Sequence, residues 1–288
     1  MPRRRPARIP VAFSAAVATL LAAGTTVHAG GQGKLEAHYV ASVAGIPIGK
    51  GTWRIDVVDD QYTANASGKT TGILQVFNAG SGQAVSRGTV NGGKPVSSTY
   101  AAIVAADKKF DEVHMTVNGG TVKEFTVEPQ WPPTPDRVPV TEAHRRGVAD
   151  PMSATLIAVG GSGDPVKPEA CQRTLSIFDG RGRYDLVLSF KRMERVKAER
   201  GYEGPVVVCA IRYRPISGHR PDRPAIRWLI EQRDMEMTLA PLVGTRVLVP
   251  YRVTIPTSIG TAVLEATEFV NGAQVARPLP STTNARTF

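Results

Sequence analysis

The stretch with the most distinctive chemistry is the segment 178–185, which reads Phe-Asp-Gly-Arg-Gly-Arg-Tyr-Asp. The glycines beside Arg181 and Arg183 would let two guanidinium groups present paired donors to a phosphate or a carboxylate. The competing interpretation is a tight β-hairpin, in which Asp179 and Gly180 form the turn and the arginines pair with Asp185 or face solvent. Because the segment lacks the GK[ST] and GxGxxG patterns of phosphate-binding loops, we prefer the hairpin.

A second cationic stretch covers residues 191–200, where lysines and arginines alternate with apolar residues. Such a segment suits contact with anionic lipid or glycan, but it also fits an exposed helix or a long hairpin arm. The candidate contacts to an anion or a partner are Arg181, Arg183, Lys191, Arg192 and Arg195.

The chain has two cysteines, Cys171 and Cys209, and we expect them to form a disulfide. Zinc is the alternative, but two thiols this far apart, with no CxxC motif and no nearby histidine pair, are a poor match to a zinc site. Closing a loop of this length is worth about 4 kcal/mol in the chain-entropy model.

Other residue types give no pattern of catalysis. The histidines are scattered without HxH or HExxH spacing, and Ser162 lacks the GxSxG context of a nucleophile elbow. No two carboxylates are placed on one inward face, as a paired-acid hydrolase requires. We therefore predict no catalytic residue, no metal, no cofactor and no enzymatic activity.

The N-terminus has the features of a secretory signal peptide. Four arginines precede an apolar run from residue 9 to 23, and Val27-His28-Ala29 offers small residues at the cleavage positions. The apolar run is shorter than the roughly 20 residues of a membrane span. We predict cleavage after Ala29 and a periplasmic product.

The charge balance constrains the partners. The full chain has a formal net charge of +10, and loss of four arginines with residues 1–29 lowers it to +6. A basic exported protein favours an anionic membrane surface or peptidoglycan, although the charge also serves solubility. Nucleic acid is not an expected partner, because export separates the protein from it.

Alternation of apolar and polar residues predicts strands through most of the chain. In residues 52–57 and 183–190 alternate side chains are apolar, and turn signals at Asp59-Asp60 and at the Asn-Gly-Gly stretches 91–93 and 118–120 bound strands of about ten residues. This spacing is typical of an antiparallel meander. In residues 206–213 the same alternation turns Cys209 toward the core.

We expect a single β-rich domain over residues 30–275, in which two segments interrupt the strands, followed by a C-terminal tail. Four prolines in residues 130–140 indicate a linker or an extended strap. Asp150-Pro151 resembles a helix start, so we predict a short helix over about 150–159. Residues 276–288 are expected to be a loose tail.

Several of these segments together resemble the family of proteobacterial domain of unknown function 3108. The resemblance rests on residues 39–49, on Asp150 to Ser153, on the run from Cys171 to Asp185, and on Cys209 with the following Tyr213 and Gly218. It implies a periplasmic protein with a curved antiparallel sheet, an open half-barrel or β-spiral, wrapped around a short helix. That shape is similar to the half-barrels of lipoprotein carriers, but fold alone does not fix function.

The leading hypothesis is a non-enzymatic envelope protein that holds a lipid or lipoprotein acyl chain on the concave face of the sheet. The alternative is an interaction or scaffold role in envelope integrity through a basic face, and a hydrolase of envelope polymers ranks third. The candidate residues of the apolar groove are Trp53, Ile55, Val57, Leu186, Leu188, Tyr251 and Val253.

Overall fold

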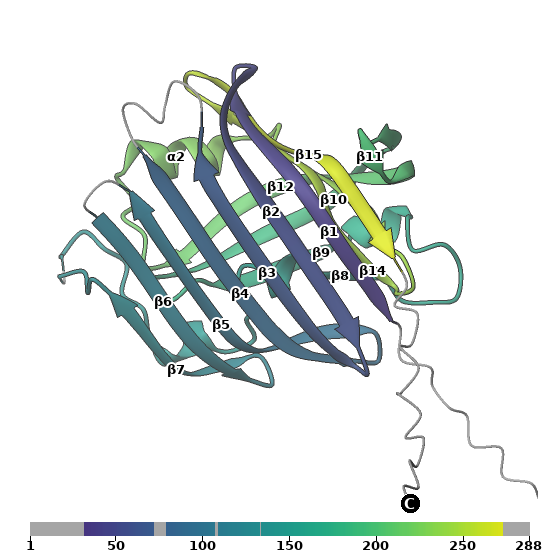
Figure 1. The fold of residues 1–288 in the computed structure, drawn as a ribbon. Coiled ribbons are helices and arrows are strands. Elements are labelled where there is room, and N and C mark those ends of the chain that lie inside the picture. Colours follow the sequence, from purple (N-terminus) through teal and green to yellow (C-terminus); the bar gives the residue numbers. More distant parts are fainter. Residues whose placement is uncertain (1–31, 72–78, 107–108, 133, 273–288) are drawn as a thin grey trace, which may run out of the picture.

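The computed structural model describes residues 32–71, 79–106, 109–132 and 134–272. Its strands form one 15-stranded sheet, in which every neighbouring pair along the main path is antiparallel. The sheet curves so that β9, β10 and β12 lie behind β2 to β5 (Figure 1). The predicted fold class, a curved antiparallel sheet that is not closed into a barrel, is confirmed.

The strands have the following bounds: β1 Gly33–Val43, β2 Ile46–Val58, β3 Gln61–Thr70, β4 Gly80–Asn91, β5 Lys94–Ala106, β6 Lys109–Asn118, β7 Thr121–Glu128, β8 Ile157–Ala158, β9 Arg173–Phe178, β10 Arg183–Lys197, β11 Arg200–Gly201, β12 Glu203–Ser217, β13 Glu236–Leu242, β14 Val247–Thr257 and β15 Gly260–Gly272. Within the described residues the α-helix is α2, Pro224–Glu231, and the 3-10 helices are Glu142–Arg145, Ser153–Thr155 and Pro168–Cys171.

The order of the strands is β7-β6-β5-β4-β3-β2-β1-β15-β14-β13-β12-β10-β9. Strands β1 to β7 follow one another as a meander, as the turn spacing predicted. Strand β1 then pairs with β15, from Lys34 opposite Gly272 to Val43 opposite Ala262. The first and last strands of the chain are therefore neighbours in the middle of the sheet.

A short segment, residues 146–155, which we call the inserted segment, connects the two edges of the sheet. The amide of Val148 donates to Gly120 at the start of β7 (2.9 Å), and the amide of Ala149 donates to Ser176 in β9 (2.9 Å). Phe125 of β7 also packs edge-to-face on Phe178 of β9, with ring centroids 5.5 Å apart. The inserted segment and this side-chain contact therefore connect the two edges, and among the described residues β7 and β9 do not pair with each other.

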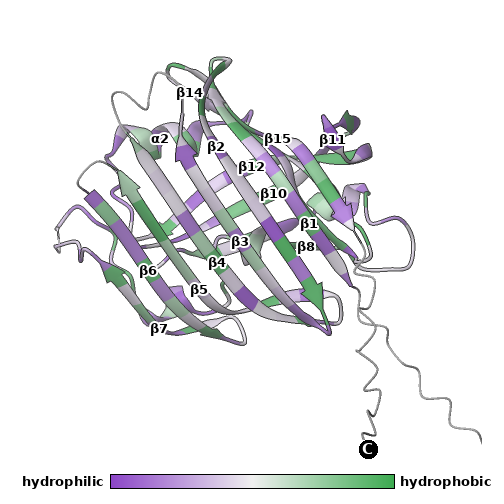
Figure 2. Cartoon of the chain, in the orientation of Figure 1, coloured by the Kyte–Doolittle hydropathy of each residue, from purple (hydrophilic) through white to green (hydrophobic). Residues whose placement is uncertain are grey.

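Polar and apolar residues alternate along the strands, and Figure 2 shows this as changes of colour along each ribbon. In β2, for example, Ile55 and Val57 are buried, Arg54 before them is exposed, and Asp56 between them is half-buried. Consecutive side chains of a strand point to opposite faces, so this alternation gives the sheet one buried face and one wet face. Gly92 and Gly93, both with positive φ, form the tight turn between β4 and β5.

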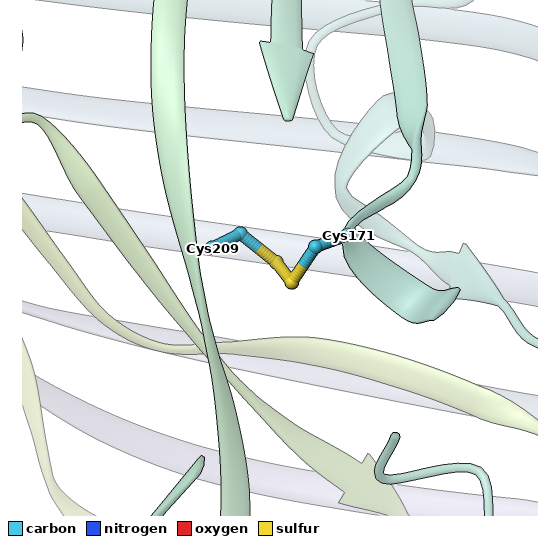
Figure 3. Close-up of a disulfide and its surroundings, with 2 residues drawn as sticks. All are labelled: Cys171 and Cys209. Carbon is cyan, nitrogen blue, oxygen red and sulfur yellow. A yellow bond between two sulfur atoms is a disulfide. The ribbon is translucent and has the colours of Figure 1, made fainter. Parts of the chain in front are cut away.

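The buried hydrophobic residues form two clusters. Strands β1 to β6 contribute to the first cluster, whereas Leu175, Leu188 and Val207 of β9, β10 and β12 belong to the second. The predicted disulfide is confirmed: Cys171 and Cys209 are both fully buried in the second cluster and are bonded (Figure 3), with their Cα atoms 5.3 Å apart.

Two predictions about the connecting segments need correction or refinement. The helix predicted over about 150–159 is wrong, because only Ser153–Thr155 form a single 3-10 turn and residues 157–158 pair with β14 as β8. The Pro-rich strap is irregular chain as predicted, and Val138 in it exchanges backbone hydrogen bonds with Gly218 and His219. The predicted signal peptide and the tail 276–288 lie outside the described residues.

The stretch 191–200 is a hairpin arm, one of the two forms considered for it, since β10 extends through it to Lys197. In the part of the chain that the structure describes, the helices are all too short or too polar to span a bilayer.

Candidate functional site

Two adjacent rows of residues across the inner face of β2, β3 and β4 consist mainly of alanine and glycine. Trp53, Ala66 and Ala84 lie opposite one another on the three strands and pack against the first hydrophobic cluster. Two residues further along each strand, Gly51, Gly68 and Gly82 are likewise in register. Because residues two apart share a face, these three glycines, which we call the glycine row, lie on the same inner face.

An apolar pocket of about 550 Å³ lies over this part of the sheet. Gly51 and Gly68 line one side, and Pro151, Met152 and Thr155 of the inserted segment line another. The remaining wall comes from β13 to β15, through Met237, Pro250, Val253 and Leu264. The volume falls within the roughly 300–1,000 Å³ of small-molecule sites, and the lining is almost wholly apolar, as is usual for such sites.

The glycine row leaves the pocket empty of side chains. A Cβ atom at Gly68 would meet no atom closer than the Lys50 carbonyl oxygen, at 3.5 Å, which is ordinary contact. At Gly51 the strand is tighter, because a Cβ atom would approach the Ser67 carbonyl oxygen to 2.8 Å. The space beside Gly68 could therefore hold a side chain, and its absence keeps the pocket open.

A buried carboxylate holds the inserted segment against this sheet. Asp150 is fully buried, and its Oδ1 accepts hydrogen bonds from the amides of Met152 (2.9 Å) and Ser153 (3.0 Å). Its Oδ2 accepts from the hydroxyls of Ser97 (2.6 Å) in β5, Ser86 (3.0 Å) in β4, and Ser153. Three of these five donors belong to the segment itself and shape its turn, and the hydroxyls of Ser86 and Ser97 fix it to the two strands.

Tyr62 of β3 joins the same network. Its hydroxyl lies 2.6 Å from Ser153 Oγ, and burial raises the pKa of the phenol above its ordinary value. A neutral phenol at this position satisfies the serine hydroxyl and adds no charge to the interior.

Two neutral polar groups, a phenol and an indole, lie in the pocket wall. Tyr39 donates its hydroxyl to the Pro250 carbonyl oxygen (2.6 Å), and burial raises its pKa far above the ordinary value. The indole Nε1 of Trp53 is buried and has no hydrogen-bond partner among the described residues. An unsatisfied buried donor beside an apolar pocket suits a ligand whose apolar body carries one acceptor.

Of the seven residues predicted to line the apolar groove, two line the pocket and five lie elsewhere. Trp53 and Val253 line the pocket. Ile55, Val57 and Tyr251 are buried in the first hydrophobic cluster, and Leu188 is buried in the second. Leu186 packs against the second cluster and does not line this pocket.

The 178–185 segment folds as the predicted hairpin turn. Asp179 Oδ1 accepts from the amides of Arg181 (2.9 Å) and Gly182 (2.8 Å). Arg181 Nη2 lies 3.0 Å from Asp111 Oδ1, and Arg183 Nη2 lies 3.7 Å from Asp185 Oδ1. Both guanidinium groups are therefore engaged with the protein itself.

Lys191 and Arg192, on β10, share one carboxylate. Glu236 Oε1 accepts from Lys191 Nζ (2.6 Å), and Glu236 Oε2 lies 2.9 Å from Arg192 Nη2. Hydrogen bonding by Arg192, and then by Lys191, lowers the pKa of Glu236 to about 2. Arg195 is exposed on the same strand. The structure thus separates Lys191, Arg192 and Arg195 from the two arginines of the hairpin.

Sequence reasoning missed the glycine row and the Asp150 network. Glycines inside predicted strands were the available signal, since a strand glycine marks a bulge or a close approach of another group. The network had no local signal, because Ser86 and Ser97 lie 64 and 53 residues before Asp150.

Comparisons with known proteins place the chain in a family. No curated protein matches the sequence. A solved structure with a similar fold is the crystal structure of a beta-barrel-like protein of domain of unknown function DUF1849 from Brucella abortus. That match has a TM-score of 0.45 and 12% sequence identity, and covers 84% of this chain and 97% of the other. The model of the family "Protein of unknown function (DUF3108)" matches residues 36–267, most of the chain, which therefore belongs to the DUF3108 family.

Proposed function

We propose that this protein is a non-enzymatic envelope protein, exported to the periplasm, that holds an apolar or lipid-type ligand on the concave face of its sheet. The observation that carries the proposal is the apolar pocket of about 550 Å³ over the glycine row. An open pocket lined by apolar atoms exposes apolar surface to water, which is unfavourable. A bound acyl chain would remove that surface from water.

Two further observations support the compartment and the ligand class. The buried disulfide suits an oxidising compartment, in agreement with the signal peptide expected from the sequence. The exposed lining of the pocket is almost wholly apolar, which suits an apolar ligand body better than a charged one. The paired charges of Lys191 and Arg192 give less support to the alternative role through a basic face.

The first experiment looks for the natural ligand. The protein is purified from the envelope fraction, denatured and extracted, and the extract is analysed by mass spectrometry. We expect a co-purifying lipid or acyl compound at a fixed ratio to protein. An extract without lipid, together with no binding of a fluorescent fatty acid to the extracted and refolded protein, would refute the proposal.

A matched pair of variants then tests the pocket. Gly68→Leu places a side chain in the open space, whereas Asn65→Leu adds the same side chain at an exposed position of the same strand. We expect Gly68→Leu to weaken binding of the fluorescent fatty acid by at least about tenfold, or 1.4 kcal/mol. Asn65→Leu should bind like the unchanged protein. Equal affinity of all three folded proteins would place the ligand elsewhere.

A further inference from the structure

A second pocket, of about 630 Å³, shares no lining residue with the apolar pocket. Three separate segments form it: the strap through Trp131, Pro132, Thr134 and Arg137, the hairpin turn with Arg181 and Arg183, and the end of β12 with the chain after it, from Ser217 to Arg223. We call it the arginine pocket. Tyr184 and Tyr213, whose ring centroids are 5.6 Å apart, form a wall of it.

The arginine pocket is rigidly built. The guanidinium of Arg181 lies 4.1 Å and that of Arg137 lies 4.4 Å from the centroid of the Trp131 ring. Arg181 is also held by Asp111 and by the Pro129 carbonyl oxygen (3.1 Å). Cation–π contacts and hydrogen bonds of this kind orient the guanidinium groups before any ligand arrives.

The pocket also contains hydrogen-bonding groups that the protein does not satisfy. Ser217 is 2% exposed, and its hydroxyl has no partner among the described residues. Arg137 donates through Nη1 to the Gly218 carbonyl oxygen (2.7 Å), but its buried Nε has no partner in the same part of the chain. Unsatisfied buried groups are rare in native structures and call for a bound partner or water.

The charges of this pocket are not balanced as they are on β10. There, Lys191 and Arg192 face Glu236. In the arginine pocket three of the five arginines have a carboxylate partner, because Arg181 pairs with Asp111, Arg183 with Asp185 and Arg220 with Asp136. Arg137 and Arg223 form no ion pair with a carboxylate among the described residues. The carboxylate that lines the pocket, Asp179, is half-buried, and its desolvation raises its pKa. The pocket therefore favours an anion.

We propose that the arginine pocket binds an organic phosphate. Donors that come from three segments around the pocket suit the tetrahedral oxygens of a phosphate group, which guanidinium groups recognise through paired hydrogen bonds. The volume exceeds the needs of inorganic phosphate alone, and the two tyrosine rings offer a surface for the organic part. The phosphate is carried by a small metabolite or by a phospholipid headgroup, and the inference is independent of the lipid pocket.

Calorimetric titration of the purified protein tests this site. The probes are inorganic phosphate, glycerol 3-phosphate, and phosphatidylcholine vesicles with and without phosphatidic acid. We expect binding of at least one phosphate probe that weakens as sodium chloride is added, because salt screens the arginines. Binding of glycerol 3-phosphate identifies a soluble ligand, and binding only to vesicles with phosphatidic acid identifies a headgroup. No binding of any phosphate probe overturns the proposal.

Three variants separate a specific site from general charge. Arg223→Gln removes an arginine without a carboxylate partner among the described residues, and Arg212→Gln removes an exposed arginine of β12 that does not line the pocket. We expect at least about tenfold weaker binding for Arg223→Gln, as for the loss of a charged hydrogen bond, and little change for Arg212→Gln. Equal effects of both would reduce the binding to non-specific attraction and refute the site.

The third variant, Ser217→Ala, tests whether the Ser217 hydroxyl binds the ligand or only stabilises the fold, because ligand affinity and melting temperature are expected to change differently. Because the hydroxyl has no partner among the described residues, its removal should leave the melting temperature unchanged or raise it. The same variant should weaken phosphate binding several-fold. Unchanged binding by Ser217→Ala, together with unchanged binding by Arg223→Gln, would show that the phosphate does not enter this pocket.

Discussion

The inner face of β2 to β4 contains small residues, whereas the strands β12 to β14 bury large side chains. Gly51, Gly68 and Gly82 are neighbours in the first region, where an apolar pocket lies over the sheet. In the second region Leu239 and Leu248 are fully buried, and Cys209 is bonded to Cys171. The same sheet thus has one region that is packed and cross-linked and one region that borders an open apolar pocket.

The two regions are also fixed by different means. The packed region is held by dispersion contacts and a covalent bond, whereas the open region depends on the hydrogen bonds that Asp150 accepts from the inserted segment and from β4 and β5. A cavity can survive next to a core when hydrogen bonds, and not side-chain volume, hold its walls apart. This contrast can be tested by weakening each region separately.

The largest effect is expected from removal of the disulfide. The double variant Cys171→Ala, Cys209→Ala should lose about 4 kcal/mol of unfolding free energy, because the unfolded chain is no longer constrained. Urea unfolding under oxidising conditions measures this loss, and reduced unchanged protein is the control. The variant and the reduced control should be similar, and fatty-acid binding should persist. If the variant is much less stable than the reduced protein, side-chain packing of Cys171 and Cys209, and not the disulfide bond, contributes most of the stability at this position.

A somewhat smaller loss is expected in the open region from Asp150→Ala. The substitution leaves buried serine hydroxyls and amides without an acceptor, which should cost about 3 kcal/mol and lower the melting temperature by about 6–12 °C. The matched control is Asp164→Ala, since Asp164 accepts one amide bond from Val166 (2.8 Å) at a less buried turn. Differential scanning calorimetry compares the two. Similar losses would show that the network around Asp150 has no special role.

The smallest effect concerns the outer side of the packed region and depends on pH. The folded-state pKa of Glu236, about 2, lies below its ordinary value of 4.5, so its ion pairs contribute stability above about pH 4.5. That contribution is lost as the pH falls through about 2. Glu236→Gln should therefore cost at most about 1 kcal/mol at pH 7 and progressively less in acid.

Denaturant midpoints measured from pH 7 to pH 2 test the pH dependence, with Glu231→Gln at an exposed position as the control. A difference between Glu236→Gln and the unchanged protein that stays constant with pH would contradict the assignment of the low pKa to this carboxylate.

Much of the architecture could be predicted from the sequence, because alternation and glycine turns are local signals. The hairpin turn at Asp179 and the inward direction of Cys209 depend on residues within a few positions of each other. The helix prediction at Asp150 failed because an Asp that accepts the amides of Met152 and Ser153 begins a 3-10 turn as readily as an α-helix. Beyond that turn the chain is extended, because Ile157 pairs with Leu248 on β14.

The pocket and its support could not be predicted in the same way. The three glycines are 17 and 14 positions apart and become neighbours only through the register of β2, β3 and β4. The seven candidate groove residues were chosen as alternating apolar residues, and this pattern selects packed positions such as Ile55 as readily as exposed cavity walls. Small residues mark a cavity, whereas an alternating pattern of large apolar residues marks the positions that fill a core.

Pairing of β1 with β15 has a consequence for biosynthesis. The N-terminal strand finds one of its two partners only when residues 260–272 have been made, so the sheet stays divided until nearly the whole chain has emerged. Contacts so distant along the chain slow folding, since their loop-closure entropy must be met first. A protein with this topology can complete its sheet only when synthesis of these last strands is finished.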